Sequence, residues 1–338
     1  MTTTTRSPLA QLARTRLAST PLRAVRGDAA TGAVPGGAAD GTVLGHLDYV
    51  PPLAHVQGPR HADLWRVDGA PRDGRTGVAR WRSCGDWTFG SVEIADDGGD
   101  LGAPAARAYH DLFAALAEAG TPHLLRLWNY LPRINDCSGG LERYRQFNVG
   151  RQQAFLDAGR SAFDGAPAAC AVGSTSERLV VHFLAGRSPV RPVENPRQTS
   201  AYRYPTQYGP RAPTFSRAAL ADLGGGTLGL FVSGTASIVG HRSLHVGDVT
   251  AQTIETVQNL RALLAEAAQR CSVAPELAAL ALVVYLRRPD DAAAVRTALA
   301  GVIGREAVER ALFLRADICR AELLVEIEGH LVAAGSLR

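Results

Sequence analysis

The sequence predicts an α+β fold made of two tandem copies of one unit, with helices packed on sheets and a flexible N-terminal extension. The chain has 338 residues, 46% hydrophobic and 20% charged, which is typical of a globular protein of two domains or one large one. Residues 87–186 and 231–330 are similar at a constant offset of 144 residues. Within each copy, apolar residues follow helical spacing in some segments and strand patterns in others.

Each copy is predicted to begin with a strand and a helix. The strands are WTFGSVEI from Trp87 and FVSGTASI from Phe231. The helices are AARAYHDLFAALAEAG, which ends at Gly120, and AQTIETVQNLRALLAEAA, which ends at Ala268. Their apolar residues lie three and four positions apart, which indicates one buried face.

Each copy continues with a second strand, a second helix and two closing strands. The second strands are LLRLWNYL and LALVVYLR, and the second helices are ERYRQFNVGRQQAFLDAG and DAAAVRTALAGVIG. The closing strands are AACAVG with RLVVHFLAG, and LFLRADI with ELLVEIEG. This order favours helices on one face of a sheet, and two copies imply a pseudo-symmetric pair with a cleft between them.

The domain organisation follows from composition and from the repeat. We expect a flexible leader over residues 1–40, where Thr, Arg, Gly and Ala are frequent and a secretory signal is not expected. The first copy lies in an N-terminal domain, 41–190, and the second in a C-terminal catalytic domain, 191–338. The C-terminal domain also holds an Arg/Tyr-rich segment, 194–217.

The composition excludes several kinds of chemistry and of partner. All 36 basic residues are Arg, so neither a Schiff-base lysine nor a Walker A lysine can exist. Five cysteines without CxxC spacing argue against disulfides or a zinc site and for a cytoplasmic protein. The net charge of +4 is spread out, and no run of about 18 apolar residues occurs, so we expect neither nucleic-acid nor membrane partners. We expect a monomer, since two fused copies can satisfy each other's contacts, and no metal, since His241 and His245 lie in a loop sequence.

The second copy resembles the YjgF/RidA family, which has a chorismate-mutase-like fold. The segments that carry the resemblance are FVSGTASIVG, AQTIETVQNLRALLAEA and VEIEG. Members of that family are trimers of one small domain that bind small keto- or imino-acids between subunits. The resemblance therefore implies one function to weigh, a small-metabolite binder or imine deaminase.

Five longer motifs, in order, resemble the chorismatase family. They are WNYLPRIN, ERYRQFNVGR, ENPRQTSAYRYPTQYGPRAPTFSR, SGTASIVGH and DICRAELLVEIEG. The resemblance implies a cofactor-free enzyme that removes pyruvate from chorismate. The second product is a dihydroxycyclohexadienoate after hydrolysis, or a hydroxybenzoate after an intramolecular route. The long Arg/Tyr-rich segment favours this family, because the basic YjgF/RidA fold lacks it.

The candidate general acid is Glu326, which lies between Val325 and Ile327 on the last strand. A carboxyl group in apolar surroundings has a raised pKa and can hold a proton near neutral pH. Glu328 faces the same side of a strand and is the competitor. The resemblance assigns the role to Glu326, and the equivalent position in the first copy is His182.

The Arg/Tyr-rich segment is a candidate anion-binding loop, since its prolines exclude a regular central strand. We expect Arg197, Arg211, Tyr204 and Tyr208 to bind the substrate, because guanidinium groups pair with carboxylates through two parallel hydrogen bonds. Arg151, at the end of ERYRQFNVGR, is expected to be a third cation. Ordinary surface ion pairs remain the alternative for each of these arginines.

Ser233, Gly234 and Thr235 are predicted to contact the ligand, because glycine lets a backbone approach closely; a β-bulge is the alternative. In the chorismatase family, Gly234 together with Cys319 resembles the pocket that forms benzoate, whereas hydrolytic members carry Ala at both places. The resemblance therefore implies 3-hydroxybenzoate as the product. The hydrolysis product and a mixture with 4-hydroxybenzoate stay open, as does an inert, buried Cys319.

Overall fold

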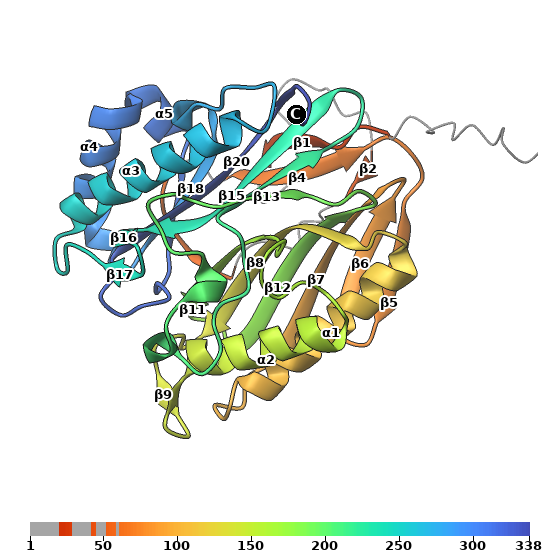
Figure 1. Ribbon diagram of the computed structural model, residues 1–338, viewed down its shortest axis with the longest axis horizontal. Coiled ribbons are helices and arrows are strands. Elements are labelled where there is room, and N and C mark those ends of the chain that lie inside the picture. The colour runs from red at the N-terminus through yellow and green to blue at the C-terminus, as the bar shows by residue number, and fades with distance from the viewer. Residues whose placement is uncertain (1–19, 29–41, 45–51, 59–60) are drawn as a thin grey trace, which may run out of the picture.

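The computed structural model describes residues 20–28, 42–44, 52–58 and 61–338 (Figure 1). Most of the expected leader, residues 1–19 and 29–40, lies outside the described residues. The described part of the leader contains strand β1 (Arg23–Asp28), which is paired along its whole length with β4 (His61–Val67). Residues 23–28 therefore belong to a sheet and not to a flexible leader, because their backbone groups bond to a neighbouring strand.

The first copy forms a six-stranded sheet with the order β11-β8-β12-β7-β6-β5. Its strands are β5 (Arg72–Thr76), β6 (Ala79–Cys84), β7 (Trp87–Ala95), β8 (His123–Pro132), β11 (Ala168–Ser174) and β12 (Arg178–Gly186). Helices α1 (Gly102–Ala119) and α2 (Arg143–Asp157) cover one face of this sheet (Figure 1). Helix α1 buries Ala105, Ala108, Tyr109, Leu112 and Leu116 against it, at the predicted helical spacing.

The second copy forms a seven-stranded sheet with the order β13-β14-β15-β20-β18-β19-β3. Its strands are β3 (Ala54–Gln57), β13 (Arg191–Val193), β14 (Ala218–Asp222), β15 (Thr227–Ala236), β18 (Ala281–Leu286), β19 (Leu312–Arg315) and β20 (Val325–Ala334). Its helices are α3 (Val249–Ala268), α4 (Ala292–Ile303) and α5 (Arg305–Glu309). Helix α3 begins after Asp248, whose side chain accepts a hydrogen bond from the Ala251 backbone N–H at 2.9 Å.

The two sheets repeat one strand order, which confirms the tandem repeat. β11-β8-β12-β7 in the first sheet corresponds to β19-β18-β20-β15 in the second. The repeat is longer than predicted, because β6-β5 likewise corresponds to β14-β13. The offset is not constant: β8 begins at His123 but β18 only at Ala281, because a longer connection follows α3.

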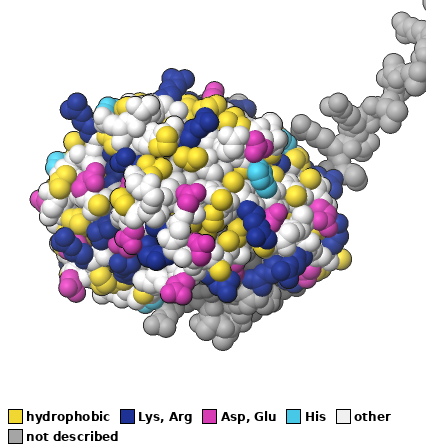
Figure 2. Space-filling view, turned by 90° about the horizontal axis from the view of Figure 1, so that it is seen from below, with side chains coloured by type: hydrophobic (Ala, Val, Ile, Leu, Met, Phe, Trp, Pro, Cys, Tyr) yellow, Lys and Arg dark blue, Asp and Glu magenta, His cyan; other side chains and the backbone are white. Residues whose placement is uncertain are grey.

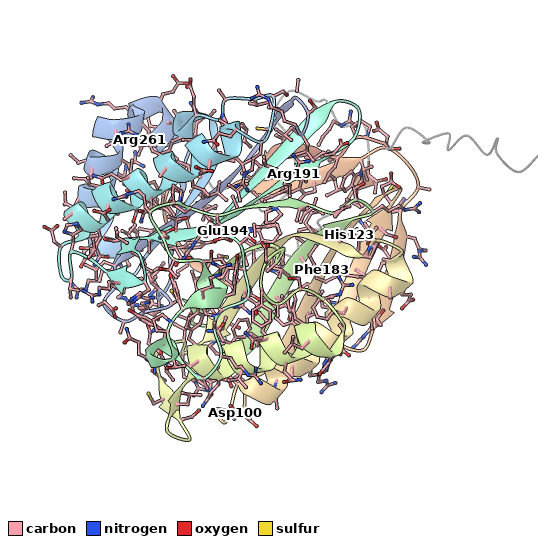
Figure 3. All side chains as sticks on the ribbon, viewed as in Figure 1. Asp100, His123, Phe183, Arg191, Glu194 and Arg261 are labelled. Atoms are coloured by element: carbon pink, nitrogen blue, oxygen red, sulfur yellow. The ribbon has the colours of Figure 1, made fainter. Side chains whose placement is uncertain are left out.

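The two sheets pack against each other, and the helices lie on their outer faces (Figure 1). Strand β8 shows how this arises from alternation. Its Leu127 and Leu131 belong to the core under α1, whereas Tyr130 packs with Ala236 and Tyr285 of the second sheet. Backbone bridges from β11 to residues 216 and 317 also join the two copies. Side chains such as that of Phe183 fill the layers (Figure 3).

A third, small sheet has the order β1-β4-β2 and includes β2 (Thr42–Val43). The remaining elements are the short strands β9 (Cys137–Ser138), β10 (Leu141–Glu142), β16 (Ile238–Val239) and β17 (Arg242–Ser243), and 3₁₀ turns at Ala201–Arg203, Thr206–Tyr208, Leu277–Ala279 and Pro289–Asp291. All five cysteines are free in this structure. Among the described residues, none of the helices has the length and apolar character needed to cross a membrane. Basic and acidic side chains are interspersed on the face shown in Figure 2.

Candidate active site

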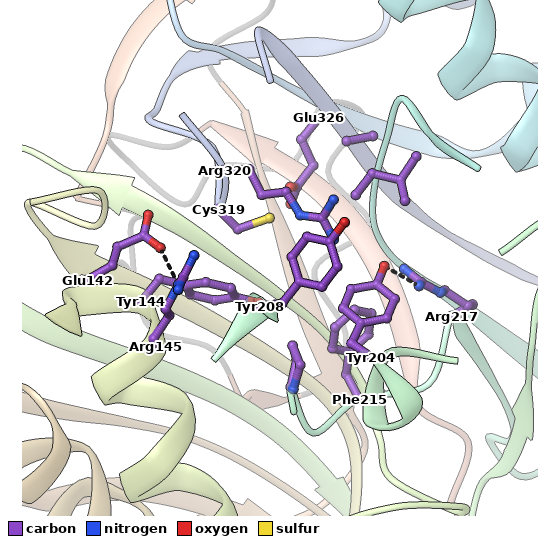
Figure 4. A pocket seen from close by; sticks show the side chains of 14 residues that line it. Glu142, Tyr144, Arg145, Tyr204, Tyr208, Phe215, Arg217, Cys319, Arg320 and Glu326 are labelled. Carbon is purple, nitrogen blue, oxygen red and sulfur yellow. Dashed lines mark hydrogen bonds and ion pairs between the residues drawn. The ribbon is translucent and has the colours of Figure 1, made fainter. Parts of the chain in front are cut away.

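A pocket lies where the two copies meet, with an empty volume of about 590 Å³ that includes its open mouth (Figure 4). The first copy contributes the start of α2, and the second contributes β15, β20 and the loop between β19 and β20. The Arg/Tyr-rich segment forms another wall. The lining residues are Glu142, Tyr144, Arg145, Tyr204, Tyr208, Pro213, Phe215, Arg217, Gly234, Ala236, Ile238, Cys319, Arg320 and Glu326.

Glu326 lies on β20 and is 4% exposed. Alternation along the strand buries Val325 and Ile327 in the core under α3 and turns Glu326 towards the pocket. Burial and then the negative charge of Glu328 raise the pKa of Glu326 to about 8, although Arg126 and Arg217 act in the opposite direction. The carboxyl group is therefore mostly protonated at neutral pH and can serve as a general acid.

Glu328, the competing carboxyl group, is bound to other side chains. It accepts hydrogen bonds from Arg126 Nη2 at 2.5 Å and from Trp128 Nε1 at 3.0 Å, both on β8 of the first copy. Arg126 and Glu328 form a buried ion pair, with side-chain exposures of 3% and 4%. Of these two glutamates, Glu326 lines the pocket and Glu328 does not, so Glu326 is the one that a substrate can reach.

Gly234 occupies a β-bulge in β15, where the register against β20 shifts between Val232 and Thr235. A Cβ atom at Gly234 would lie 1.9 Å from Glu326 Oε1 and 3.3 Å from Cys170 Cβ. The structure therefore combines the two alternatives that the sequence left open, a bulge and a close approach. The group that approaches Gly234 is the carboxyl group of Glu326.

Cys319 lies in the loop between β19 and β20 and lines the pocket as a free, half-buried thiol. Burial and then the nearby Glu326 carboxyl group raise the pKa of this thiol to about 12. Nucleophilic and metal-binding cysteines need the thiolate form. At neutral pH, Cys319 is instead a protonated, weakly polar wall of the pocket beside the acid.

Two of the three arginines that line the pocket have a buried nitrogen without a hydrogen-bond partner. Arg217 donates from Nη2 to the Tyr204 hydroxyl at 2.8 Å and to the Thr199 carbonyl at 2.7 Å, while its buried Nε–H has no partner. Arg320 donates from Nη1 to the His241 carbonyl at 2.9 Å, while its buried Nη2 has no partner. Buried N–H groups normally have partners, so these two donors are suited to binding an anion.

The Arg/Tyr-rich segment connects β13 to β14, the position at which the first copy has only the short turn between β5 and β6. Two 3₁₀ turns in this segment present Tyr204 and Tyr208 to the pocket. The Arg320 guanidinium lies 4.1 Å from the centre of the Tyr208 ring and 5.3 Å from that of Tyr204. The two rings therefore flank a cation at the pocket wall (Figure 4).

Two of the arginines predicted on this segment do not reach the pocket. Arg197 donates to Glu255 and Asn259 on α3, both at 2.6 Å, so its guanidinium group is held by a helix outside the pocket. Arg211 is exposed and contacts Gln152 at 3.3 Å. Both side chains thus make the surface contacts that the sequence left open as the alternative.

Three further predicted residues are buried beside the pocket instead of lining it. Arg151 on α2 donates to Asn148 at 2.7 Å, and its guanidinium lies 4.9 Å from the centre of the Phe147 ring. The Ser233 hydroxyl accepts from the Ala169 backbone N–H at 2.9 Å and so joins the two copies. The Thr235 hydroxyl donates to the Ser233 carbonyl at 2.9 Å. The two hydroxyl groups thus bond within the protein, whereas Nε of Arg151 is buried without a hydrogen-bond partner.

Sequence reasoning missed Arg217, Arg320, Tyr144 and Arg145 as lining residues. Each was within a motif already singled out: Arg217 ends the Arg/Tyr-rich segment, and Arg320 directly follows Cys319. Adjacency to Cys319 was the one available signal for Arg320. Nothing in the residue order distinguishes Arg217 from Arg197.

Strands β12 and β20 correspond at the offset of 144 residues, which places His182 of β12 where the second copy has Glu326. His182 is buried, and its Nδ1 lies 2.9 Å from the Ser91 hydroxyl. Burial and then Arg80 lower the pKa of His182 to about 3, so it stays neutral. The first copy therefore holds a neutral side chain at the position where the second copy holds its acid.

Comparisons with known proteins agree with this arrangement. A family model described as chorismatase FkbO/Hyg5-like, N-terminal, matches residues 63–185. A chorismatase of Streptomyces rapamycinicus is 38% identical over 275 residues, 79% of this chain and 81% of the relative. A 3-hydroxybenzoate synthase of Streptomyces hygroscopicus is 38% identical over 282 residues, 79% of this chain and 80% of the relative. A crystal structure of a chorismatase aligns with a TM-score of 0.79 at 31% identity and covers 93% of this chain and 99% of that one.

Proposed function

Because the chain belongs to the chorismatase family, and is therefore an enzyme that acts on chorismate, we propose that it forms 3-hydroxybenzoate and pyruvate in the pocket around Glu326. The observation that carries the proposal is a buried acid with a raised pKa in a pocket that also holds two unpartnered guanidinium N–H groups. The name of one relative, 3-hydroxybenzoate synthase, supports this choice of product.

Arg217 and Arg320 would bind the substrate. Chorismate carries two carboxylates, one on its ring and one on the enolpyruvyl group, and each arginine has one free donor for such a group. Arg145 adds a third positive charge at the pocket wall, although it is paired with Glu142 at 3.1 Å. The rings of Tyr204 and Tyr208 offer flat surfaces to the six-membered ring of the substrate.

Glu326 would start the reaction by donating its proton to the terminal methylene carbon of the enolpyruvyl group. The methylene becomes a methyl group, and the ether carbon becomes an oxocarbenium ion. The new carboxylate of Glu326, together with the anionic Glu328 behind it, stabilises this cation. The ether bond to ring carbon C3 is then weak enough to break.

The substrate's own 4-hydroxyl would complete the reaction. Its oxygen bonds to C3 as the C3–O ether bond breaks, and the electrons of that bond form the pyruvate carbonyl. The hydroxyl proton returns to Glu326, which restores the acid. The resulting epoxide opens and the ring aromatises with net transfer of one proton from carbon to oxygen. The sum, chorismate to 3-hydroxybenzoate and pyruvate, consumes no water.

Cys319 and Gly234 would exclude water from this step. The Cys319 thiol forms part of the pocket wall beside Glu326. Gly234 leaves room for the Glu326 carboxyl group against β15. A water molecule admitted next to the oxocarbenium ion would give the dihydroxycyclohexadienoate instead. The two residues thus decide between rearrangement and hydrolysis.

The test is to incubate the protein with chorismate, without added metal or cofactor, and to separate the products by chromatography. We expect pyruvate and 3-hydroxybenzoate in equal amounts, and a loss of at least about 100-fold in kcat for Glu326→Gln, because the amide cannot donate the proton. Glu306→Gln is the matched control, since the Glu306 side chain is 91% exposed and far from the chemistry. Pyruvate with the non-aromatic diol would contradict the product, and full activity of Glu326→Gln would contradict the acid.

A further inference from the structure

The loop between β19 and β20, residues 316–324, carries both Cys319 and Arg320 into the pocket. Most of this loop is not hydrogen-bonded to a neighbouring strand. Its ends are fixed by backbone hydrogen bonds, from Ala316 to the Leu286 carbonyl at 3.0 Å and from Arg287 to the Leu324 carbonyl at 3.0 Å. Its middle is held largely by side chains.

A single guanidinium group, that of Arg287, binds this loop at four points. Arg287 follows β18 and donates from Nε to the Leu323 carbonyl at 2.8 Å and from Nη1 to Asp317 Oδ1 at 2.9 Å. Its Nη2 donates to the carbonyls of Ile318 and Arg320, both at 3.0 Å. These two carbonyls flank Cys319, so Arg287 fixes the backbone on either side of the thiol.

Asn135 extends the network to the opposite wall of the pocket. It comes from the first copy, accepts from Arg287 Nη2 at 3.1 Å, and donates to the Ile318 carbonyl at 3.1 Å. The same amide donates to Glu142 Oε1 at 3.3 Å, and Glu142 lines the pocket and pairs with Arg145. One chain of hydrogen bonds therefore connects the two walls that face the substrate.

We propose that Arg287, assisted by Asn135, is a positioning residue that sets the product by fixing where Cys319 and Arg320 stand in the pocket. The proposal rests on the proposed function, in which Cys319 excludes water and Arg320 binds a carboxylate. Arg287 does not line the pocket and touches no reacting atom, so it acts through the loop. Only a planar, forked side chain can reach all these acceptors at once; a lysine ammonium keeps the charge but not the geometry.

The experiment compares Arg287→Lys with Arg315→Lys. Arg315 also pairs with Asp317, at 3.1 Å, but makes no bond to the carbonyls beside Cys319, which makes it the matched control. For Arg287→Lys we expect the KM for chorismate to rise at least about fivefold, and the diol to appear beside 3-hydroxybenzoate, because displacement of a positioned group by about 1 Å is costly. For Arg315→Lys we expect both values to stay within about twofold of the parent.

A Cys319→Ala variant separates failure of this proposal from failure of the proposed function. If Cys319→Ala leaves the product unchanged, the role of Cys319 in the proposed function is wrong. If Cys319→Ala yields diol but folded Arg287→Lys keeps the parent product ratio and KM, the role of Arg287 is wrong. Should Arg287→Lys fail to fold, Asn135→Ala tests the network by the same two measurements, because it removes the bonds of Asn135 to Arg287 and to the Ile318 carbonyl. A folded Asn135→Ala with the product ratio and KM of the parent would contradict the proposal that this network positions the loop.

Discussion

Glu326 and Glu328 lie on the same face of β20, yet their surroundings differ. The Glu328 carboxylate pairs with the buried Arg126 guanidinium and accepts a hydrogen bond from the Trp128 indole N–H. The Glu326 carboxyl group has no ion-pair partner among the described residues. The negative charge of Glu328 opposes the ionisation of Glu326. Glu328, which Arg126 and Trp128 hold in place, thus helps to keep Glu326 protonated.

This coupling predicts the pH dependence of the reaction. Glu326 acts in its protonated form, so activity is full at low pH and is lost as the pH rises through about 8. Glu328→Gln removes a negative charge while Arg126 and Arg217 remain, which favours ionised Glu326. We expect the loss of kcat/KM to shift to lower pH by about one unit, measured as a pH–rate profile at a temperature where the variant is folded.

Charged and titratable groups from several packed elements surround Glu326. They are Glu328 on the same strand, Arg126 on β8, Arg217 before β14, Cys170 on β11, Tyr285 on β18, Cys319 in its loop and Tyr144 on α2.

The control for Glu328→Gln is Trp128→Phe, because it removes one hydrogen bond to Glu328 but keeps the charge of Glu328. An unchanged profile for Glu328→Gln would show that the two carboxyl groups do not interact.

At the scale of elements, β15 differs from its counterpart β7 by its bulge. Strand β7 pairs with β12 in a continuous register over nine residues. The bulge in β15 turns the backbone at Gly234 so that the carboxyl group of the neighbouring strand fits against it. The second copy thereby gains space for an acid that the first copy does not need.

Gly234→Ala should therefore displace the Glu326 carboxyl group, since the added methyl group would overlap it. We expect kcat to fall about tenfold and the diol fraction to rise, while the protein stays folded, because a flexible carboxyl group can move aside. Gly301→Ala is the control, as a Cβ atom there meets nothing within 4 Å. If Gly234→Ala keeps the kcat and the product ratio of the parent protein, Gly234 does not influence which product forms.

At the scale of the whole molecule, one apolar cluster joins the three larger sheets. It includes Trp65 of β4, Leu184 of β12 and Phe231 of β15. The rings of Trp65 and Phe231 have centroids 5.6 Å apart. Together with the buried Arg126–Glu328 pair between the copies, this cluster favours cooperative unfolding of the two copies.

Phe231→Ala should accordingly destabilise the whole molecule by about 3–5 kcal/mol, because it leaves a cavity at the junction of the sheets. We expect a single unfolding transition, shifted to lower denaturant concentration, in both the parent and the variant. Phe163→Ala is the control, since Phe163 is 46% exposed. Two separate transitions would mean that the copies unfold independently.

Local sequence determined much of this protein. Apolar spacing is sufficient to place two helices and the four central strands of each copy, because burial of one face dictates a period of 3.6 or 2 residues. It did not predict the outer strands β5 and β6 of the first sheet or β13 and β14 of the second. Alternation also places Glu326 and Glu328 on one face of one strand. The motif residues Glu326, Gly234, Cys319, Tyr204 and Tyr208 do meet in one pocket.

Only the tertiary structure decided which polar group does what. Arg126, which neutralises Glu328, lies in the other copy, 202 residues away, so no local pattern can distinguish the two glutamates. Arg197 and Arg217 stand on the same segment, but Glu255 of α3 holds the first, while the fold turns the second into the pocket. Residue type and spacing fix what a side chain can do. Its charge state and its free donors depend on partners that are distant in sequence and meet only when the chain is folded.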